Sequence, residues 1–215
     1  MITRGFLWRW ARAATSPFGD LSCAILFERS LAGPVPPAAN RLRVSLRLAD
    51  EDDLDMICTL YAGDSWLWLG TGPGDHAARA HYVERMRRGE LCYLALVDGQ
   101  LAHVNWICFS WGEALPGRPL RLRAGEVYTT DAFTPTPFRG KGVHAFVLGT
   151  MLNDARERGA RHAFTLGALD RPDALKGLQA LGWRETGRVT YFQPRGMSQT
   201  PLMIRRGMTE PLFRH

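Results

Sequence analysis

The sequence lacks any run of about 18 consecutive apolar residues, which is roughly what a helix needs to cross a membrane. Its N-terminal segment is basic and hydrophobic, but Arg9 and Arg12 interrupt the apolar run and no clean small-residue cleavage site follows. We therefore expect no secretory signal and no stable membrane insertion, and we expect the protein to be cytoplasmic.

Cysteine is scarce, and its spacing excludes the usual metal and redox motifs. The four cysteines form no Cys-x-x-Cys pair, and none is placed as a convincing nucleophile. Apolar neighbours such as Ile57 and Ile107 predict buried, reduced thiols. We expect no metal site. The cysteines are Cys23, Cys58, Cys92 and Cys108.

A long basic block is also absent. The net charge of +6 and the sequence pI of about 9.5 suit an anionic ligand, a nucleic acid or an acidic membrane surface. The arginines are scattered over several segments, so they lack the focused stripe that neutralises successive phosphates. We predict that the protein has no nucleic-acid partner.

The composition is that of a soluble globular protein, with 46% apolar and 22% charged residues. The one clear linker is residues 33–40, where three prolines stiffen the chain. The sequence therefore predicts an N-terminal extension with a proline-rich linker over residues 1–40 and one main domain over residues 41–215.

Hydrophobic periodicity in the main domain predicts the element order β-α-α-β-β-β-α-β-α-β-β. Asp50 and Asp53 predict the start of the first helix, and Asp98-Gly99 predicts a tight hairpin. The hairpin needs antiparallel neighbours and the helical crossovers need parallel ones, so we predict an α/β domain with a mixed sheet. The strands are predicted at 41–48, twice within 91–111, and at 126–133, 162–169, 186–193 and 201–206, with helices at 50–61, 75–88, 142–158 and 170–181.

The junction at residues 134–146, TPTPFRGKGVHAF, joins a predicted strand to a predicted helix. Such a junction leaves backbone N–H groups unpaired, and glycines allow a ligand to approach them. Arg139 and Lys141 add positive charge, so the pattern predicts a site for an anion. The alternative is that Gly140 and Gly142 serve only a tight turn.

Two nucleotide-binding patterns fit this junction poorly. The phosphate loop of nucleotide hydrolases needs a glycine and a hydroxyl residue where this chain has Pro135 and Gly142. A dinucleotide fingerprint can be drawn as Gly140-x-Gly142-x-x-Ala145, with Asp170 as the ribose-binding acid. However, only 73 residues follow Gly142, too few for the remaining strands of a doubly wound sheet.

From about residue 41 to residue 193, the element order resembles the GNAT acyltransferase superfamily. RGKGVH (139–144) resembles its Arg/Gln-x-x-Gly-x-Gly/Ala acyl-coenzyme A motif, with Arg139 and Gly142 at matching positions. RLADEDDL (47–54) is similar to its first strand-to-helix entry, and ALKGLQALGWRETGR (174–188) looks like its last helix and Gly-aromatic pair. The resemblance implies a mixed, largely antiparallel central sheet flanked by helices. It also implies an N-acyltransferase that uses acetyl-coenzyme A, or another acyl-coenzyme A, as co-substrate.

The resemblance also implies co-substrate contacts and shows departures from the family. His144 stands where Gly or Ala is usual, and Arg171 and Leu178 occupy the places of an asparagine and of the tyrosine that protonates the leaving thiolate. Tyr191 is therefore our substitute candidate for the acid. The residues expected to contact acyl-coenzyme A are Phe133, Thr134, Arg139, Gly140, Lys141, Gly142, Val143 and His144.

In the family, a carboxylate on or near the strand before the glycine loop often deprotonates the amine. Glu126 is the first candidate for this base and Asp131 is the second. Strand alternation places their side chains on opposite faces unless a bulge resets it. A backbone N–H of the same strand is expected to hold the thioester carbonyl.

The acceptor pocket is expected to be lined from the hairpin, the strand at 126–133 and the glycine-rich segment 64–75. A structural His–Asn pair and ordinary packing of the tryptophans are the alternatives. The acceptor is expected to be a small-molecule or peptide amine, and a homodimer is compatible with the sequence. The predicted lining residues are His103, Asn105, Tyr128, Trp66 and Trp68.

Two other functions remain open from the sequence. The absent tyrosine and His144 are compatible with a non-catalytic module that binds coenzyme A. The basic surface is compatible with acyl transfer or decarboxylation on an acidic carrier protein of a biosynthetic pathway.

Overall fold

The computed structural model describes residue 15 and residues 18–36, 38–62, 76–115, 118–169, 172–194 and 202–207. The chain divides into two compact units. The central unit comprises residues 30–112 and 122–163, and the terminal unit comprises residues 1–29, 113–121 and 164–215. The predicted sites at Trp66, Trp68 and Arg171 lie outside the described residues.

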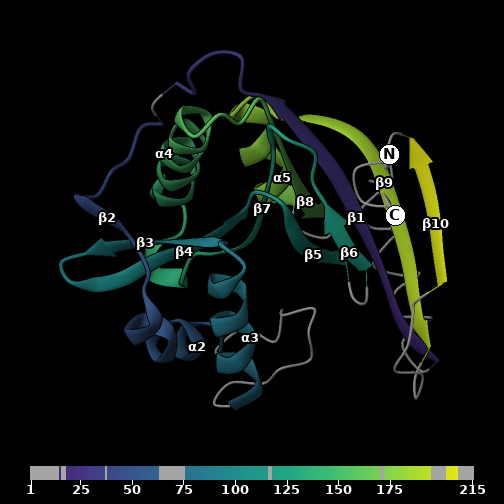
Figure 1. The fold of residues 1–215 in the computed structure, drawn as a ribbon, viewed down its shortest axis with the longest axis horizontal. Coiled ribbons are helices and arrows are strands. Elements are labelled where there is room, and N and C mark those ends of the chain that lie inside the picture. Colours follow the sequence, from purple (N-terminus) through teal and green to yellow (C-terminus); the bar gives the residue numbers. More distant parts are fainter. Residues whose placement is uncertain are drawn as a thin grey trace. The chain divides into compact units, whose positions relative to one another are not determined.

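In the central unit, the sheet has the strand order β7-β4-β3-β2 with antiparallel neighbours. Helices α2 and α3 cover one face of this sheet and α4 covers the other (Figure 1). The strands are β2 (Val44–Leu48), β3 (Leu91–Val97), β4 (Gln100–Cys108) and β7 (Glu126–Phe133). The helices are η1 (Glu51–Asp53), α2 (Leu54–Ala62), α3 (His76–Arg87), η2 (Thr136–Phe138) and α4 (Val143–Glu157).

Local sequence signals explain where these elements begin and turn. Asp50 and Asp53 form the predicted capping box, in which the backbone N–H of Asp50 donates to the Asp53 carboxylate at 3.0 Å. The β3–β4 hairpin turns at Asp98 and Gly99, which both have positive φ angles, +50° and +78°.

The terminal unit has the strand order β10-β9-β1-β8. Strand β1 pairs antiparallel with β9, from Gly19 opposite Pro194 to Glu28 opposite Arg184. A separate two-stranded sheet consists of β5 and β6. The bounds are β1 (Gly19–Ser30), β5 (Trp111–Leu115), β6 (Arg118–Arg121), β8 (His162–Ala168), α5 (Pro172–Ala180), β9 (Arg184–Pro194) and β10 (Leu202–Gly207).

The predicted fold class and element order are confirmed, since every predicted strand and helix is present. Strands β1, β5 and β6 were not predicted. In β1, Ala24 to Phe27 are at most 3% exposed, so the strand is a continuous apolar run without the alternation that reveals a half-buried strand. The predicted domain boundary at residue 40 stays a prediction.

The described helices contain none that is long and apolar enough to cross a membrane. No group of three or more His, Cys, Asp or Glu side chains in the described ranges is arranged to hold a metal ion. All four cysteines are free thiols, and Cys58 is half-buried rather than buried.

A β-bulge interrupts β7 near its end. Val104 lies opposite Phe133 and Trp106 lies opposite Thr130, so two steps along β4 correspond to three steps along β7. Asp131, within the bulge, has a φ of +50°. The bulge resets the strand alternation, because Thr130 and Phe133 now share the face toward α2 and α3.

Arg85 on α3 stabilises this bulge from the face of the sheet that α2 and α3 cover. Its guanidinium forms ion pairs with Asp131 and, at 2.8 Å, with Glu90, and it stacks 4.2 Å from the Trp106 ring. Arg85 and Glu90 side chains are 5% and 3% exposed. The Tyr61 hydroxyl donates to the Asp131 carbonyl at 2.5 Å. The charge of Arg85 is therefore buried, and it is shared between Asp131 in the bulge and Glu90.

We predict that Arg85→Met will destabilise the protein by about 3–5 kcal/mol, because it leaves two carboxylates without their buried partner. Arg88→Met is the matched control, since Arg88 follows the last residue of α3 and forms a more exposed ion pair with Glu84. Its effect should stay within about 0.5 kcal/mol. Urea unfolding measures both. Equal losses in the two variants would contradict the role given to Arg85.

Candidate functional site

The predicted anion loop lies in the central unit, between β7 and α4. Gly140 and Gly142 have φ angles of +71° and +86°, which other L-residues rarely adopt. A Cβ atom on Gly140 would meet nothing within 4 Å, whereas one on Gly142 would lie 2.3 Å from the Ala39 carbonyl oxygen. Gly140 thus keeps its side of the loop open, and Gly142 allows a close backbone contact.

The helix after the loop starts without a side-chain cap. Gly142 is the N-cap of α4, and its carbonyl accepts the first helical bond from Phe146 N at 3.0 Å. The N–H groups of Val143, His144 and Ala145 belong to the first turn, where no intrahelical acceptor exists. Together with the positive end of the helix dipole, they can bind an anion.

Two cations flank this turn. Arg139 and Lys141 are exposed. Arg139 donates from Nε to the Thr134 carbonyl at 2.7 Å, and its guanidinium lies 5.7 Å from the Phe133 ring. The structure thus gathers the eight predicted co-substrate residues in one continuous segment, from the end of β7 to the first turn of α4.

Two histidines connect the loop to the sheet. His103 on β4 is fully buried, its Nδ1 lies 2.7 Å from the Thr134 hydroxyl, and its Nε2 lies 3.4 Å from His144 Nδ1. Burial lowers the pKa of His144 to about 4. Burial, and then the His144 ring, lower the pKa of His103 well below its usual value. Both rings are therefore neutral near pH 7, and His144 lies half-buried against His103.

The predicted acceptor residues lie on both faces of the sheet. His103 and Asn105 share the face toward α4, whereas Tyr128 lies opposite Cys108 on the face toward α2 and α3. Asn105 is 1% exposed and donates to the Thr130 carbonyl at 2.9 Å, so it supports the bulge. Burial raises the pKa of Tyr128 above its usual range. The structure does not bring these three side chains together, and their role in acceptor binding stays a prediction.

Within the central unit, the structure does not bring together Glu126 and Asp131, two of the three predicted catalytic residues. Glu126, at the start of β7, accepts from the Arg123 N–H at 2.8 Å and so closes a turn. It lies five residues, or roughly 16 Å of strand, from the bulge. Asp131 lies in the bulge, with its side chain 20% exposed and paired with Arg85. Tyr191 is a buried residue of β9 in the terminal unit.

Arg85 and Tyr61 are site-supporting residues that the sequence did not predict. Arg85 follows a basic helical stretch that resembles a solvated surface, and nothing in its spacing indicates that Asp131, 46 positions later, becomes its partner. The one nearby signal in the sequence is Glu90, five positions after Arg85. An acidic residue so close to the end of the helix is compatible with an ion pair to Arg85.

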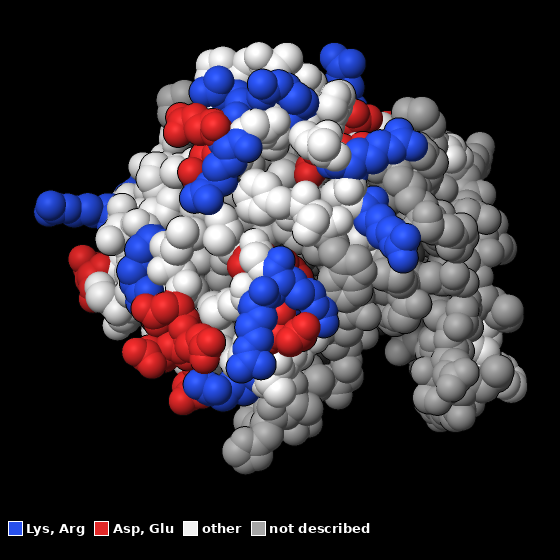
Figure 2. Space-filling view, in the orientation of Figure 1, with Lys and Arg blue, Asp and Glu red and all other residues white. Residues whose placement is uncertain are grey.

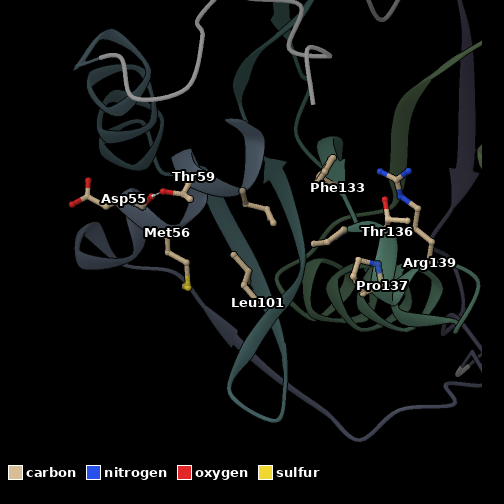
Figure 3. Close-up of a pocket in the computed structure, with 10 residues that line it drawn as sticks. Asp55, Met56, Thr59, Leu101, Phe133, Thr136, Pro137 and Arg139 are labelled. Carbon is tan, nitrogen blue, oxygen red and sulfur yellow. Dashed lines mark hydrogen bonds between the residues drawn. The ribbon is translucent and has the colours of Figure 1, made fainter. Parts of the chain in front are cut away.

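An open groove of about 810 Å³ lies next to the anion loop. In Figure 3, Met56 and Thr59 of α2 line one side, Phe133, Thr136 and Arg139 line the other, and Leu101 lies between them. Asp55 and Arg139 mark its two ends. The apolar lining residues are Met56, Leu60, Leu101, Phe133, Pro135 and Pro137.

Charges of both signs mix across the visible surface of the described residues (Figure 2). Acidic side chains gather over η1 and the start of α2, where Glu51, Asp52 and Asp55 follow one another closely. Basic side chains are interspersed with them and form no continuous area in this view. The described residues visible in this view therefore form no extended basic stripe.

No protein-family model matches the sequence, and the curated proteins give no match. Solved structures do match. A GCN5-related N-acetyltransferase from Sphaerobacter thermophilus is 16% identical at a TM-score of 0.59, covering 88% of this chain and 59% of that one. A ribosomal-protein-alanine N-acetyltransferase from Brucella melitensis is 20% identical at a TM-score of 0.56, covering 76% and 99%.

A protein described as an acetyltransferase of the GNAT family, from Novosphingobium aromaticivorans, is 16% identical at a TM-score of 0.53 and covers 80% of this chain and 63% of its own. The chain thus spans less than two thirds of two of these proteins. At this level of identity the likeness concerns the fold alone: the chain has the GNAT fold.

The histidine pair generates a prediction about pH. The folded-state pKa of His144, about 4, lies below the value of 6.5 for a free histidine, so the folded protein binds fewer protons. Its contribution to stability is complete above pH 6.5 and is lost as the pH falls toward 4. His144→Gln should reduce the stability lost between pH 7 and pH 4 by about 1–2 kcal/mol.

Urea unfolding of the wild type and of His144→Gln at both pH values measures this difference. Because carboxylates titrate equally in the two proteins, they cancel in the comparison. The same loss in both proteins would show that folding does not lower the pKa of His144.

Proposed function

We propose that the protein is an acyl-coenzyme A-dependent N-acyltransferase, with acetyl as the acyl group and direct transfer to an amine. The observation that carries this proposal is the anion loop at the start of α4, placed directly after a bulged strand within a GNAT fold. Neighbours with this fold that are named N-acetyltransferases support it.

The residues of the loop fit the phosphates of coenzyme A. Gly140 leaves open space beside the backbone, and Arg139 and Lys141 are exposed cations. The open N–H groups of the first turn of α4 supply hydrogen-bond donors at the positive end of the helix. Neutral His144 adds no charge, so its role would be to hold Thr134 through His103.

Acyl transfer needs little chemistry from the protein beyond positioning and carbonyl polarisation. The amine nitrogen forms a bond to the thioester carbon, the C–S bond breaks, and the amine proton passes to a base. The bulge leaves Asp131 and Ala132 without a register partner on β4, so a backbone N–H there is a suitable donor to the thioester carbonyl. The groove next to Phe133 would receive a small-molecule or peptide amine.

The direct test measures thiol release. Incubation with acetyl-coenzyme A and a panel of amines should release free thiol with at least one acceptor, in the presence of a chelator. Coenzyme A binding without thiol release from any amine would favour the non-catalytic module instead.

Arg139→Ala should weaken coenzyme A binding by about ten- to a hundredfold, because it removes a charge-assisted phosphate contact. Arg79→Ala is the control, since Arg79 is an exposed arginine of α3 that pairs with Asp55. Calorimetric titration gives both affinities and circular dichroism checks the fold. Unchanged affinity in a folded Arg139→Ala variant would mean that this loop is only a turn.

Asp131 is our proposed base, because it is the candidate carboxylate that lies at the bulge. Asp131→Asn should lower kcat by about a hundredfold while circular dichroism shows an intact fold. Asparagine tolerates the positive φ of this position and can still bond to Arg85. Glu126→Gln should change kcat less than threefold, roughly, as expected for a turn-closing residue. The opposite ranking would make Glu126 the base.

A further inference from the structure

The proline-rich linker does more than join two parts of the chain. Val35 is 3% exposed, and both of its peptide groups pair with the side chain of Asn153 on α4. Asn153 Oδ1 accepts from the Val35 N–H at 2.8 Å, and Asn153 Nδ2 donates to the Val35 carbonyl at 3.0 Å. The linker is thus fastened to α4 at one end by a two-point amide contact.

The other end of the linker is fastened to the anion loop itself. The Arg41 N–H donates to the Lys141 carbonyl at 3.0 Å. The Ala39 carbonyl packs so closely on Gly142 that a Cβ atom there would lie 2.3 Å away. Both loop residues stand at the entrance to α4, where the open N–H groups begin.

Between these two points, Val35 and Pro36 lie beside the middle of the helix. A Cβ on Gly149 would lie 3.8 Å from both the Pro36 carbonyl and the Val35 side chain, an ordinary contact. From residue 142 to residue 153 the helix rises roughly 16 Å at about 1.5 Å per residue. From residue 35 to residue 41 an extended proline-rich chain spans roughly 19 Å at about 3.1 Å per residue. The linker is therefore long enough to be held nearly taut.

We propose that the segment from Val35 to Arg41, described at residues 35–36 and 38–41, acts as a strap that positions the anion loop for acyl-coenzyme A, with Asn153 as the positioning residue. The inference rests on the proposed function for the identity of the ligand. By holding the Lys141 carbonyl and Gly142, the strap orients the peptide groups that lead into α4 and keeps the loop in its binding conformation. A stiff segment suits this task because it has few alternative conformations to lose.

The test removes the contact between Asn153 and Val35 and measures how often the anion loop opens and how tightly it binds coenzyme A. In Asn153→Ala without ligand, hydrogen exchange at residues 140–145 should become severalfold faster. Affinity for free coenzyme A, measured by calorimetric titration, should fall about tenfold, since the competent conformation becomes less populated. At saturating acetyl-coenzyme A, kcat should stay within about twofold of wild type, because the strap contacts no reacting atom.

Thr150→Ala is the matched control. Thr150 is exposed on the same helix, and its hydroxyl bonds to the Phe146 carbonyl of its own helix at 3.1 Å. Pro36→Gly loosens the strap while keeping the Pro36 carbonyl, and should shift exchange and affinity in the same direction by a smaller factor. If Asn153→Ala does not fold, Pro36→Gly serves as the test variant in its place.

Exchange and affinity equal to those of Thr150→Ala, in both strap variants, would overturn the proposal. A different outcome separates it from the proposed function. If the wild type does not bind coenzyme A and Asn153→Ala still accelerates exchange in the loop, the strap holds and the acyltransferase assignment fails.

Discussion

The ion pair between buried Arg85 and half-buried Asp131 is the interaction on which the candidate site depends. A bulge costs the sheet its regular pairing, and Asp131 takes a backbone conformation that few non-glycine residues adopt. Arg85 offsets these costs from one side, while Tyr61 and Asn105 bond to the carbonyls of Asp131 and Thr130.

The bulge then directs Phe133 into the groove and starts the chain toward the anion loop. An aromatic core, with Tyr82 and Trp106 stacked at 5.3 Å, supports Arg85 in turn.

The anion loop combines a fixed backbone with a small number of charges. Its donors are peptide groups, oriented by two glycines with positive φ, by the start of α4 and by the strap from the linker. Its exposed cations add attraction without setting the geometry. The neutral His103–His144 pair connects the two sides of the loop without adding charge near the ligand site. Selectivity for a phosphate-bearing ligand would thus come from backbone geometry, and attraction from Arg139 and Lys141.

The features of the fold and of the candidate site that depend on neighbouring residues could be predicted from the sequence. The capping box at Asp50, the hairpin at Asp98-Gly99 and the glycine loop before α4 each depend on neighbouring residues, and each is present. Features that depend on distant partners could not be predicted. The bulge follows from a pairing register, Arg85 finds Asp131 on another element, and Gly142 meets Ala39 from the linker. The buried strand β1 has no alternating pattern, so neither the strand nor its pairing with β9 could be predicted.

The central claim is that the turn entering α4 binds the phosphates of an acyl-coenzyme A. Amide chemical shifts of the isotope-labelled protein, followed during titration with coenzyme A, test it at the level of single residues. The account predicts saturable shifts concentrated at residues 139–145, extending to the bulge at residues 130–133. Shifts confined to other parts of the chain, or none at millimolar coenzyme A, would contradict it.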